Sequence, residues 1–359
     1  MGITPQPGIM DIALYEGGKS AIAGREDVLK LSSNENPLGP PASALAALSE
    51  AATGMHLYPS TDHAGLRAAI GEVHGLDPDQ IICGVGSDEV LQFVTQAFAG
   101  PGDEIIHTEH GFSLYPVLIH MAGATAVKVL ERERQVDIDA IIAAVTPRTR
   151  IILVTNPGNP TGTMIPVSEL ERLVDAVSHD IVIVLDGAYT EYAHGYDGGV
   201  ALAGSRPNVL MPRTFSKIYG LGGLRIGRGY ADRAMIEIMT RIRQPFNLSV
   251  VQLAAAEAAV RDRAWVQNCA ALNADQRGRL TGALRQLGLA CDDAHGNFVL
   301  ARLADEDEAA VADAALQADG ILVRRVTGYG VPEGLRITVG DEAQTSRVIA
   351  ALTRWREGA

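Results

Sequence analysis

The middle of the chain, from residue 80 to residue 230, alternates short apolar runs with amphipathic segments. The apolar runs have the length of strands and the segments between them have the length of helices, which predicts a mostly parallel sheet covered by helices. In such a sheet, ligands bind beyond the carboxyl ends of the strands. The expected strands are residues 81–83, 104–108, 125–130, 151–155, 181–186, 209–212 and 224–230.

After residue 232 the sequence becomes rich in Ala and Arg and gives helical segments at 250–260 and 265–287. Short strands at 297–300, 321–324 and 335–339 and a helix at 341–356 then indicate a smaller α+β unit. We expect three parts: an arm packing on the small domain or a partner subunit, a large α/β domain, and an interdomain helix joined to the small domain. These parts cover residues 1–30, 31–250 and 251–359.

Composition limits the partners of the chain. Its 359 residues exceed the size of one compact core. The net charge of -13 argues against nucleic acid or an anionic membrane surface as a partner, because both would repel the protein. Any anionic substrate must therefore meet a local group of arginines.

Localisation is predicted from the cysteines and the apolar segments. Three widely spaced cysteines, at positions 83, 269 and 291, fit a reduced compartment better than a disulfide framework. Residues 1–10 lack a signal-peptide pattern, and no apolar stretch is long enough to span a bilayer. We expect a cytoplasmic protein.

A lone lysine, Lys217, lies in the Gly-rich segment 213–225 with Thr214, Ser216 and Arg225. Such a lysine is usually a solvated surface charge. Its setting also suits pyridoxal phosphate, because the amine can bond to the aldehyde while the hydroxyls and the guanidinium reach the phosphate.

Two further motifs lie in a matching order. Asn159 opens an Asn-Pro-Thr-Gly turn, and Asp186 ends an apolar strand three residues before Tyr189. A carboxylate at the end of that strand could keep a pyridine nitrogen protonated, although it could also be a helix cap. Tyr189 and Asn159 are candidate donors to the ring oxygen of the cofactor.

The segment containing Gly86, Ser87 and Asp88 follows a short strand and opens a helix expected at 90–98. Backbone amides at a helix start, with Ser87 as a plausible cap, form an anion site. The same pattern can be a simple turn or part of a dinucleotide site. The lysine segment favours a cofactor phosphate.

Together these motifs resemble the fold-type I aminotransferases, from about residue 15 to the last helix. The resemblance implies that Phe112, where the family commonly has Tyr, stacks on the cofactor, with core packing as the alternative. It also implies that Arg336, in an apolar strand, clamps a substrate carboxylate. His107, Glu109 and His110 form a small cluster, but we expect no metal.

The resemblance narrows to the histidinol-phosphate aminotransferase family through the segment 31–40, the Tyr58-Pro59 pair, and Arg324 preceding Gly328-Tyr329-Gly330. It implies that a substrate phosphate is bound by Arg324 and Arg336. The remaining expected contacts are Tyr15, Asn36 and Asn159 at the substrate and Tyr58 at the cofactor phosphate of the neighbouring subunit of a homodimer.

The implied reaction is amino transfer between glutamate and imidazole acetol phosphate, giving 2-oxoglutarate and L-histidinol phosphate, in histidine biosynthesis. Three alternatives stay open: an aromatic (phenylalanine or tyrosine) aminotransferase, threonine-phosphate decarboxylase, and a cofactor-binding regulator without turnover. Arg324 and Tyr15 count against the first. The regulator would require a basic DNA-binding module, for which the sequence has neither room nor charge.

Overall fold

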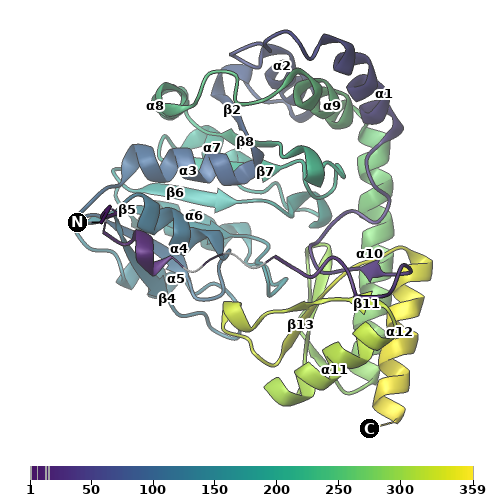
Figure 1. The fold of residues 1–359 in the computed structure, drawn as a ribbon. Helices are drawn as coiled ribbons and strands as arrows, with labels where there is room; N and C mark the ends of the chain where they lie inside the picture. Colours follow the sequence, from purple (N-terminus) through teal and green to yellow (C-terminus); the bar gives the residue numbers. More distant parts are fainter. Residues whose placement is uncertain (1, 6, 13, 15–16, 359) are drawn as a thin grey trace.

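The computed structural model of the chain describes residues 2–5, 7–12, 14 and 17–358. Figure 1 shows a large sheet with helices on both faces, a smaller unit below it, and the long helix α10 (Arg263–Gln286) running between the two. None of the helices in these residues is both long and apolar enough to cross a membrane.

The large sheet has seven strands in the order β2-β8-β7-β6-β5-β3-β4. Strand β8 is antiparallel to its two neighbours, and all other neighbouring pairs are parallel, which confirms the predicted mostly parallel sheet. The strands are β2 (Ile81–Gly84), β3 (Glu104–Thr108), β4 (Thr125–Val129), β5 (Thr149–Thr155), β6 (Val182–Asp186), β7 (Val209–Thr214) and β8 (Gly227–Tyr230). β8 starts later than expected because Gly222–Leu224 forms a 3-10 turn, η5.

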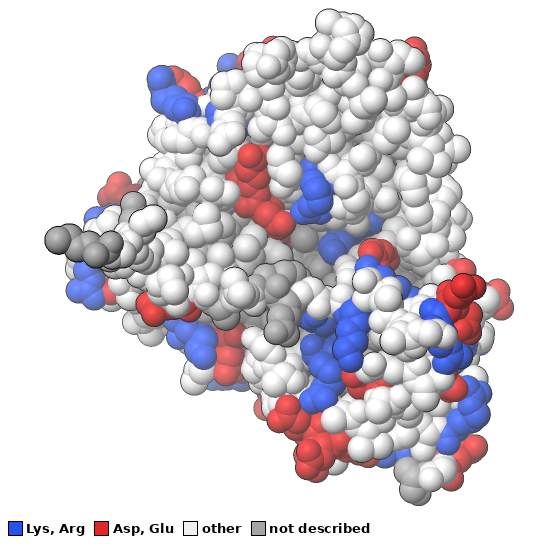
Figure 2. Space-filling view, viewed as in Figure 1, with Lys and Arg blue, Asp and Glu red and all other residues white. Residues whose placement is uncertain are grey.

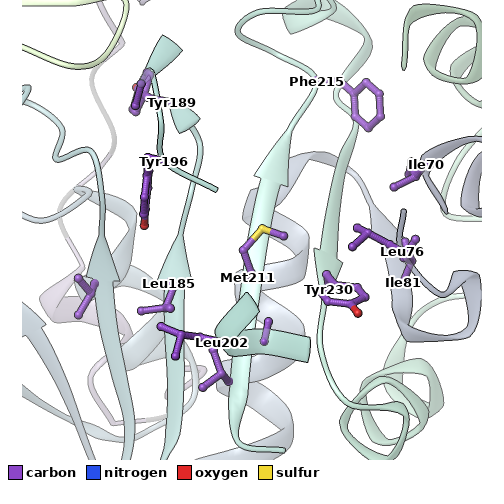
Figure 3. Close-up of a cluster of buried hydrophobic side chains, with 14 of the residues drawn as sticks. Ile70, Leu76, Ile81, Leu185, Tyr189, Tyr196, Leu202, Met211, Phe215 and Tyr230 are labelled. Atoms are coloured by element: carbon purple, nitrogen blue, oxygen red, sulfur yellow. The ribbon is translucent and has the colours of Figure 1, made fainter. Parts of the chain in front are cut away.

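Alternate side chains of each strand pack into two separate cores. Ile151 and Leu153 of β5 face one core, whereas Ile152 and Val154 face the other, as the two-residue period of a strand requires. The first core is covered by α3 (Gly86–Phe98), α4 (Leu114–Met121) and α8 (Arg233–Ile242). The second, part of which Figure 3 shows, is covered by α2 (Ala64–His74), α5 (Ile138–Ala143), α6 (Val167–Ala176) and α7 (Val200–Ser205).

The smaller unit is a four-stranded antiparallel sheet in the order β12-β13-β10-β9. Buried apolar residues of this sheet form a third core with α10, α11 (Glu306–Ala318) and α12 (Glu342–Glu357). β9 was not predicted, because two residues are too few to show a periodic pattern. The strands are β9 (Ala290–Cys291), β10 (Phe298–Arg302), β12 (Arg324–Arg325) and β13 (Gly334–Thr338).

The N-terminal part of the chain reaches the small unit before it joins the large one. β1 (Leu29–Lys30) pairs in parallel with β11 (Ile321–Leu322), and α1 (Ala42–Ala51) then begins the large unit. The helix α9 (Val250–Arg261) packs against α1 and α2 rather than bridging the units. The predicted domain boundary near residue 250 stays a prediction.

Candidate active site

A cavity of about 170 Å³ lies at the carboxyl ends of the large-sheet strands, where the small sheet meets them. Figure 2 shows basic atoms inside the hollow between the upper and lower parts of the molecule, with acidic atoms beside it. The cavity brings together most of the residues selected from the sequence: Ser87, Asp88, Phe112, Asn159, Asp186, Tyr189, Thr214, Ser216, Lys217, Arg225, Arg324 and Arg336.

Lys217 lies three residues beyond the end of β7 and reaches into this cavity. Its Nζ donates to the carbonyl oxygen of Ser33 at 3.2 Å and lies 5.8 Å from the centre of the Tyr189 ring. Burial, with the nearby charge of Arg336, lowers the pKa of the Lys217 amine to about 8. An amine with this pKa is partly neutral near physiological pH and can act as a nucleophile or base.

Asp186 is the last residue of β6 and is 3% exposed. Its Oδ2 accepts a hydrogen bond from the Tyr115 hydroxyl at 3.0 Å, and its Oδ1 accepts one from the Ala188 amide at 3.2 Å. Burial raises the pKa of this carboxyl group to about 6. A buried carboxylate facing a cavity is suited to hold a cationic or protonated group of a ligand.

An anion cradle is formed where β7, β8 and α3 meet. The Arg225 guanidinium donates to Ser216 Oγ at 3.0 Å and to Asp88 Oδ2 at 3.1 Å. The hydroxyl oxygen of Thr214 accepts from the Ser216 amide at 3.1 Å. A Cβ on Gly227 would lie 2.1 Å from the amide nitrogen of the next cradle residue, Ser87, so only glycine lets β8 lie this close to the start of α3.

The predicted start of α3 needs a correction. The helix begins at Gly86, which has a φ of 78°, and not at residue 90. The N-cap is Val85, and it makes no side-chain capping bond. Ser87 is therefore not the cap, because the helix begins two residues earlier than a Ser87 cap would require, and Ser87 lies in its first turn. The amide nitrogen of Ser87 still lies beside Gly227 at the cradle, where the start of a helix favours an anion.

Two arginines lie on neighbouring strands at the small-sheet wall of the cavity. Arg336 of β13 donates to Asn159 Oδ1 at 2.6 Å and to the Ser32 carbonyl at 3.0 Å, and its Nε has no hydrogen-bond partner among the described residues. Arg324 of β12 is its Cα partner and also lines the cavity. Arg325 lies outside it and forms an ion pair with Glu306 at 3.3 Å, because adjacent residues of a strand face opposite sides.

The segment 31–40 contributes a different asparagine from the one predicted. Asn34, with a φ of 56°, lines the cavity and donates to the Tyr189 hydroxyl at 3.0 Å. Asn36 does not line it: its Nδ2 donates to the Ile218 carbonyl at 2.7 Å and its Oδ1 accepts from the Leu38 amide at 3.0 Å. The geometry gives no support to Asn36 as a substrate ligand, because both ends of its amide hold the loop.

One predicted residue lies outside the cavity, and another is not among the described residues. Tyr58 is 81% exposed, and its ring lies 4.5 Å from that of Phe246, outside the cavity. Tyr15 lies outside the described residues. In the part of the chain that the structure describes, no group of three His, Cys, Asp or Glu side chains is arranged to hold a metal.

Comparison with known proteins agrees with this geometry. The family described as aminotransferase class I and II matches residues 26–352. The chain belongs to this family. It is 61% identical to the histidinol-phosphate aminotransferase of Ruegeria pomeroyi over 99% of this chain and 98% of the relative. It is 60% identical to that of Jannaschia sp. over 98% of each chain.

A solved structure of the same kind of enzyme has the same fold. The crystal structure of histidinol-phosphate aminotransferase from Sinorhizobium meliloti in complex with pyridoxal-5'-phosphate matches with a TM-score of 0.90 and 26% identity. The match covers 98% of this chain and 97% of that one. The fold-type I architecture predicted from the sequence is confirmed.

Several cavity residues of this aminotransferase were not predicted from the sequence. They are Ser32, Ser33, Asn34, Thr155, Ala188 and Tyr329, together with Tyr115 beneath Asp186. Asn34 and Tyr329 stand inside motifs that had been noticed, so their polar character was the available signal. Tyr115 lies in an apolar helix, and its sequence context predicts a core residue. No nearby motif in the sequence indicates the contact with Asp186.

Proposed function

We propose that this chain is a pyridoxal-phosphate-dependent histidinol-phosphate aminotransferase of L-histidine biosynthesis. It exchanges an amino group between L-glutamate and imidazole acetol phosphate, with 2-oxoglutarate and L-histidinol phosphate as the other pair. The observation that carries this proposal is the pair of arginines, Arg324 and Arg336, which lie on adjacent strands and line the cavity. The same cavity contains the amine of Lys217, whose pKa is lowered. We also propose a cytoplasmic enzyme, since its three cysteines are unpaired thiols.

The phosphate end of the cofactor fits the cradle. A phosphate dianion needs several donors, and Arg225, Ser216, Thr214 and the first-turn amides of α3 provide them in one place. Asp88 pairs with Arg225 at 3.1 Å and fixes its position. We assign these residues, with Gly86 and Ser87, to the cofactor phosphate.

The directions of the hydrogen bonds support a place for the ring end of the cofactor as well. Arg336 can only donate, so Asn159 presents its oxygen to Arg336 and leaves its amide nitrogen as a donor toward the cavity. The Tyr189 oxygen accepts from Asn34, which leaves the phenol proton available for a ring oxygen. We assign Asp186 to the pyridine nitrogen and Phe112, whose ring borders the cavity, to one face of the ring.

The reaction divides into roles that these side chains can perform. When bound, the cofactor supplies an aldehyde and an electron-withdrawing ring. Lys217 would hold the cofactor through its aldehyde carbon, and its amine, when free, would serve as the base that moves the proton of the substrate Cα. Asp186 holds a proton at the ring nitrogen throughout. We assign to Arg336 the orientation of the glutamate carboxylate in one half-reaction and of the phosphate in the other; alternation of the two half-reactions gives ping-pong kinetics.

Substrate comparison tests the proposed function. Histidinol phosphate, phenylalanine and tyrosine are each supplied as amino donors to 2-oxoglutarate, and carbon dioxide release from threonine phosphate is measured in parallel. We expect the largest kcat/KM for histidinol phosphate and no carbon dioxide release. A preference for phenylalanine or tyrosine, or decarboxylation, would identify one of the alternative activities instead.

Arg324 is expected to separate the phosphate substrate from glutamate. Arg324→Ala should weaken the binding of histidinol phosphate by about 1.5–3 kcal/mol, the range for a hydrogen bond to a charged group. The binding of glutamate should change much less. The reason is that a phosphate carries close to two negative charges and needs a second guanidinium. Arg325→Ala is the matched control, because this neighbour faces Glu306. Single-turnover titrations of each half-reaction measure the effect, and equal losses for both donors would show that the phosphate pocket is misassigned.

We further propose a homodimer with shared active sites. Large apolar side chains are exposed near Tyr58: Met55 is 66% exposed, Leu57 62% and Phe246 41%. Figure 2 shows few charged atoms over α1, α2 and α9. An exposed apolar surface of this kind is typical of an interface. The role of Tyr58 at the cofactor phosphate of the second subunit rests on this dimer.

Mixing two inactive variants tests the shared site. Tyr58→Ala and Lys217→Ala subunits should each have low activity as pure proteins. After subunit exchange, activity should rise toward about a quarter of wild type, because half of the dimers are mixed and each contains one complete site. If ultracentrifugation shows that the mixed subunits form dimers but activity does not recover, the role of Tyr58 is contradicted.

A further inference from the structure

Two hydrogen bonds connect the large unit to the small one at the rim of the cavity. His110 Nδ1 lies 2.7 Å from the carbonyl oxygen of Tyr329, and Ser113 Oγ lies 3.1 Å from the Tyr329 hydroxyl. A carbonyl oxygen only accepts, so His110 Nδ1 must carry the proton. We refer to His110, Ser113 and Tyr329 as the rim latch.

Each side of the rim latch carries a residue of the proposed site. On the large unit, Phe112 lies between His110 and Ser113 and borders the cavity. On the small unit, Tyr329 ends the turn η6 (Thr327–Tyr329), which follows β12 and its cavity residue Arg324 after a single residue, Val326. The latch therefore joins the loop that carries the aromatic wall to the segment that carries a phosphate-binding candidate.

The small-unit side of the latch is fixed to its own sheet. Tyr329 packs against a buried cluster of Leu300, Val326 and Val331. Gly330, with a φ of 77°, ends the turn, and a Cβ there would lie 3.6 Å from the His110 imidazole. The turn thus moves with the small sheet and packs closely against the histidine.

The large-unit side is fixed by two acidic residues. The backbone amide of His110 donates to Oε1 of the half-buried Glu131 at 3.3 Å, and His110 Nε2 lies 3.9 Å from Glu109 Oε2. These contacts direct Nδ1 toward Tyr329. The imidazole can donate from Nδ1 both in its cationic form and in the matching neutral tautomer, so the latch does not depend on one protonation state.

We propose that His110 is a positioning residue for substrate selection, acting through the rim latch. It sets the spacing between the wall at Phe112 and the guanidinium of Arg324, and so favours a substrate long enough to place a phosphate at Arg324. Arg336 is held separately, by Asn159 and Ser32, so the binding of glutamate depends less on the latch. This inference rests on the proposed function for its substrates but not for the latch itself.

Three variants test the latch. His110→Leu removes the donor at similar volume, His110→Asn keeps a side-chain amide that can donate in its place, and Ser113→Ala removes the second bond only. The control is His179→Leu, which removes an exposed imidazole before β6. For His110→Leu we expect the KM for histidinol phosphate to rise about 3- to 10-fold, as for loss of one hydrogen bond, while the KM for glutamate changes less than about twofold. His110→Asn should restore most of the difference.

Two readouts do not depend on the substrate. Hydrogen exchange of the 324–330 backbone in the cofactor-loaded protein should increase in His110→Leu, and to a smaller extent in Ser113→Ala, but not in the control. The dissociation constant for pyridoxal phosphate should stay near that of wild type in all of them. Unchanged exchange in 324–330, or equal KM changes for both donors, would overturn the latch. If wild type does not use histidinol phosphate while exchange still increases, the proposed function fails and the latch stands.

Discussion

Lys217→Ala is expected to lower amino transfer about 10⁴-fold, because the variant loses both the group that holds the aldehyde and the base that moves the Cα proton. The variant should still fold, since among the described residues Lys217 makes one hydrogen bond, to the Ser33 carbonyl. Wild type should be yellow, and borohydride reduction should make its link to the cofactor permanent. Peptide mapping should then place the label on Lys217.

Lys128→Ala, at an exposed position of β4, is the matched control and should keep colour, label and turnover.

The pH dependence gives a second check. Only the neutral amine attacks an aldehyde, and the pKa of Lys217 is lowered to about 8 from 10.5. Attachment of pyridoxal phosphate to the apoprotein should therefore accelerate as the pH rises through about 8 and level off above it. A label on another lysine would exclude Lys217 from this role.

Asp186→Asn should reduce turnover about 10²- to 10³-fold while most of the fold and cofactor binding are kept. A neutral amide has almost the same shape as the carboxylate but cannot hold a proton on the ring nitrogen. Tyr115 and the Ala188 amide donate to different oxygens of the carboxylate. An asparagine has only one side-chain oxygen, so one of these hydrogen bonds is lost and some loss of stability is also expected. Single-turnover rates with glutamate and thermal unfolding measure the two effects separately.

The control for Asp186 is Asp180→Asn, which changes an exposed carboxylate shortly before β6.

In the apoprotein the pKa of Asp186 is raised to about 6, so the carboxylate is ionised above that pH and protonated below it. The affinity of wild type for the cofactor should accordingly decrease as the pH falls through about 6, whereas Asp186→Asn should lack this dependence. Turnover near the wild-type value in Asp186→Asn would contradict the assignment to the ring nitrogen.

The sequence predicted the strands of the large sheet because that signal is local. An apolar run such as 151–155 is buried on both faces, and its length and composition are sufficient to indicate a strand. β9 was missed because two residues show no period. The start of α3 was misplaced because a glycine at positive φ, Gly86, opened the helix before the amphipathic pattern began.

The site was predicted to the extent that its residues stand in recognisable motifs at strand ends. Lys217, Asp186 and Arg336 each belong to such a motif, and the parallel strands bring their ends to one edge. In the segment 31–40, sequence alone could not choose between Asn34 and Asn36. The choice depends on the positive φ of Asn34 and on the Ile218 carbonyl that takes up the other amide.

The sequence by itself therefore determined the mostly parallel sheet, the family resemblance and the lysine at its centre, since these depend on local periodicity and on short motifs. Only the tertiary structure decided which polar groups meet. Tyr115 lies under Asp186, 71 residues away, and His110 contacts Tyr329, 219 residues away. Periodicity fixes the face on which a side chain lies, but partners this distant are set by tertiary packing: of α4 on the large sheet for Tyr115 and Asp186, and of the small unit against the large one for His110 and Tyr329.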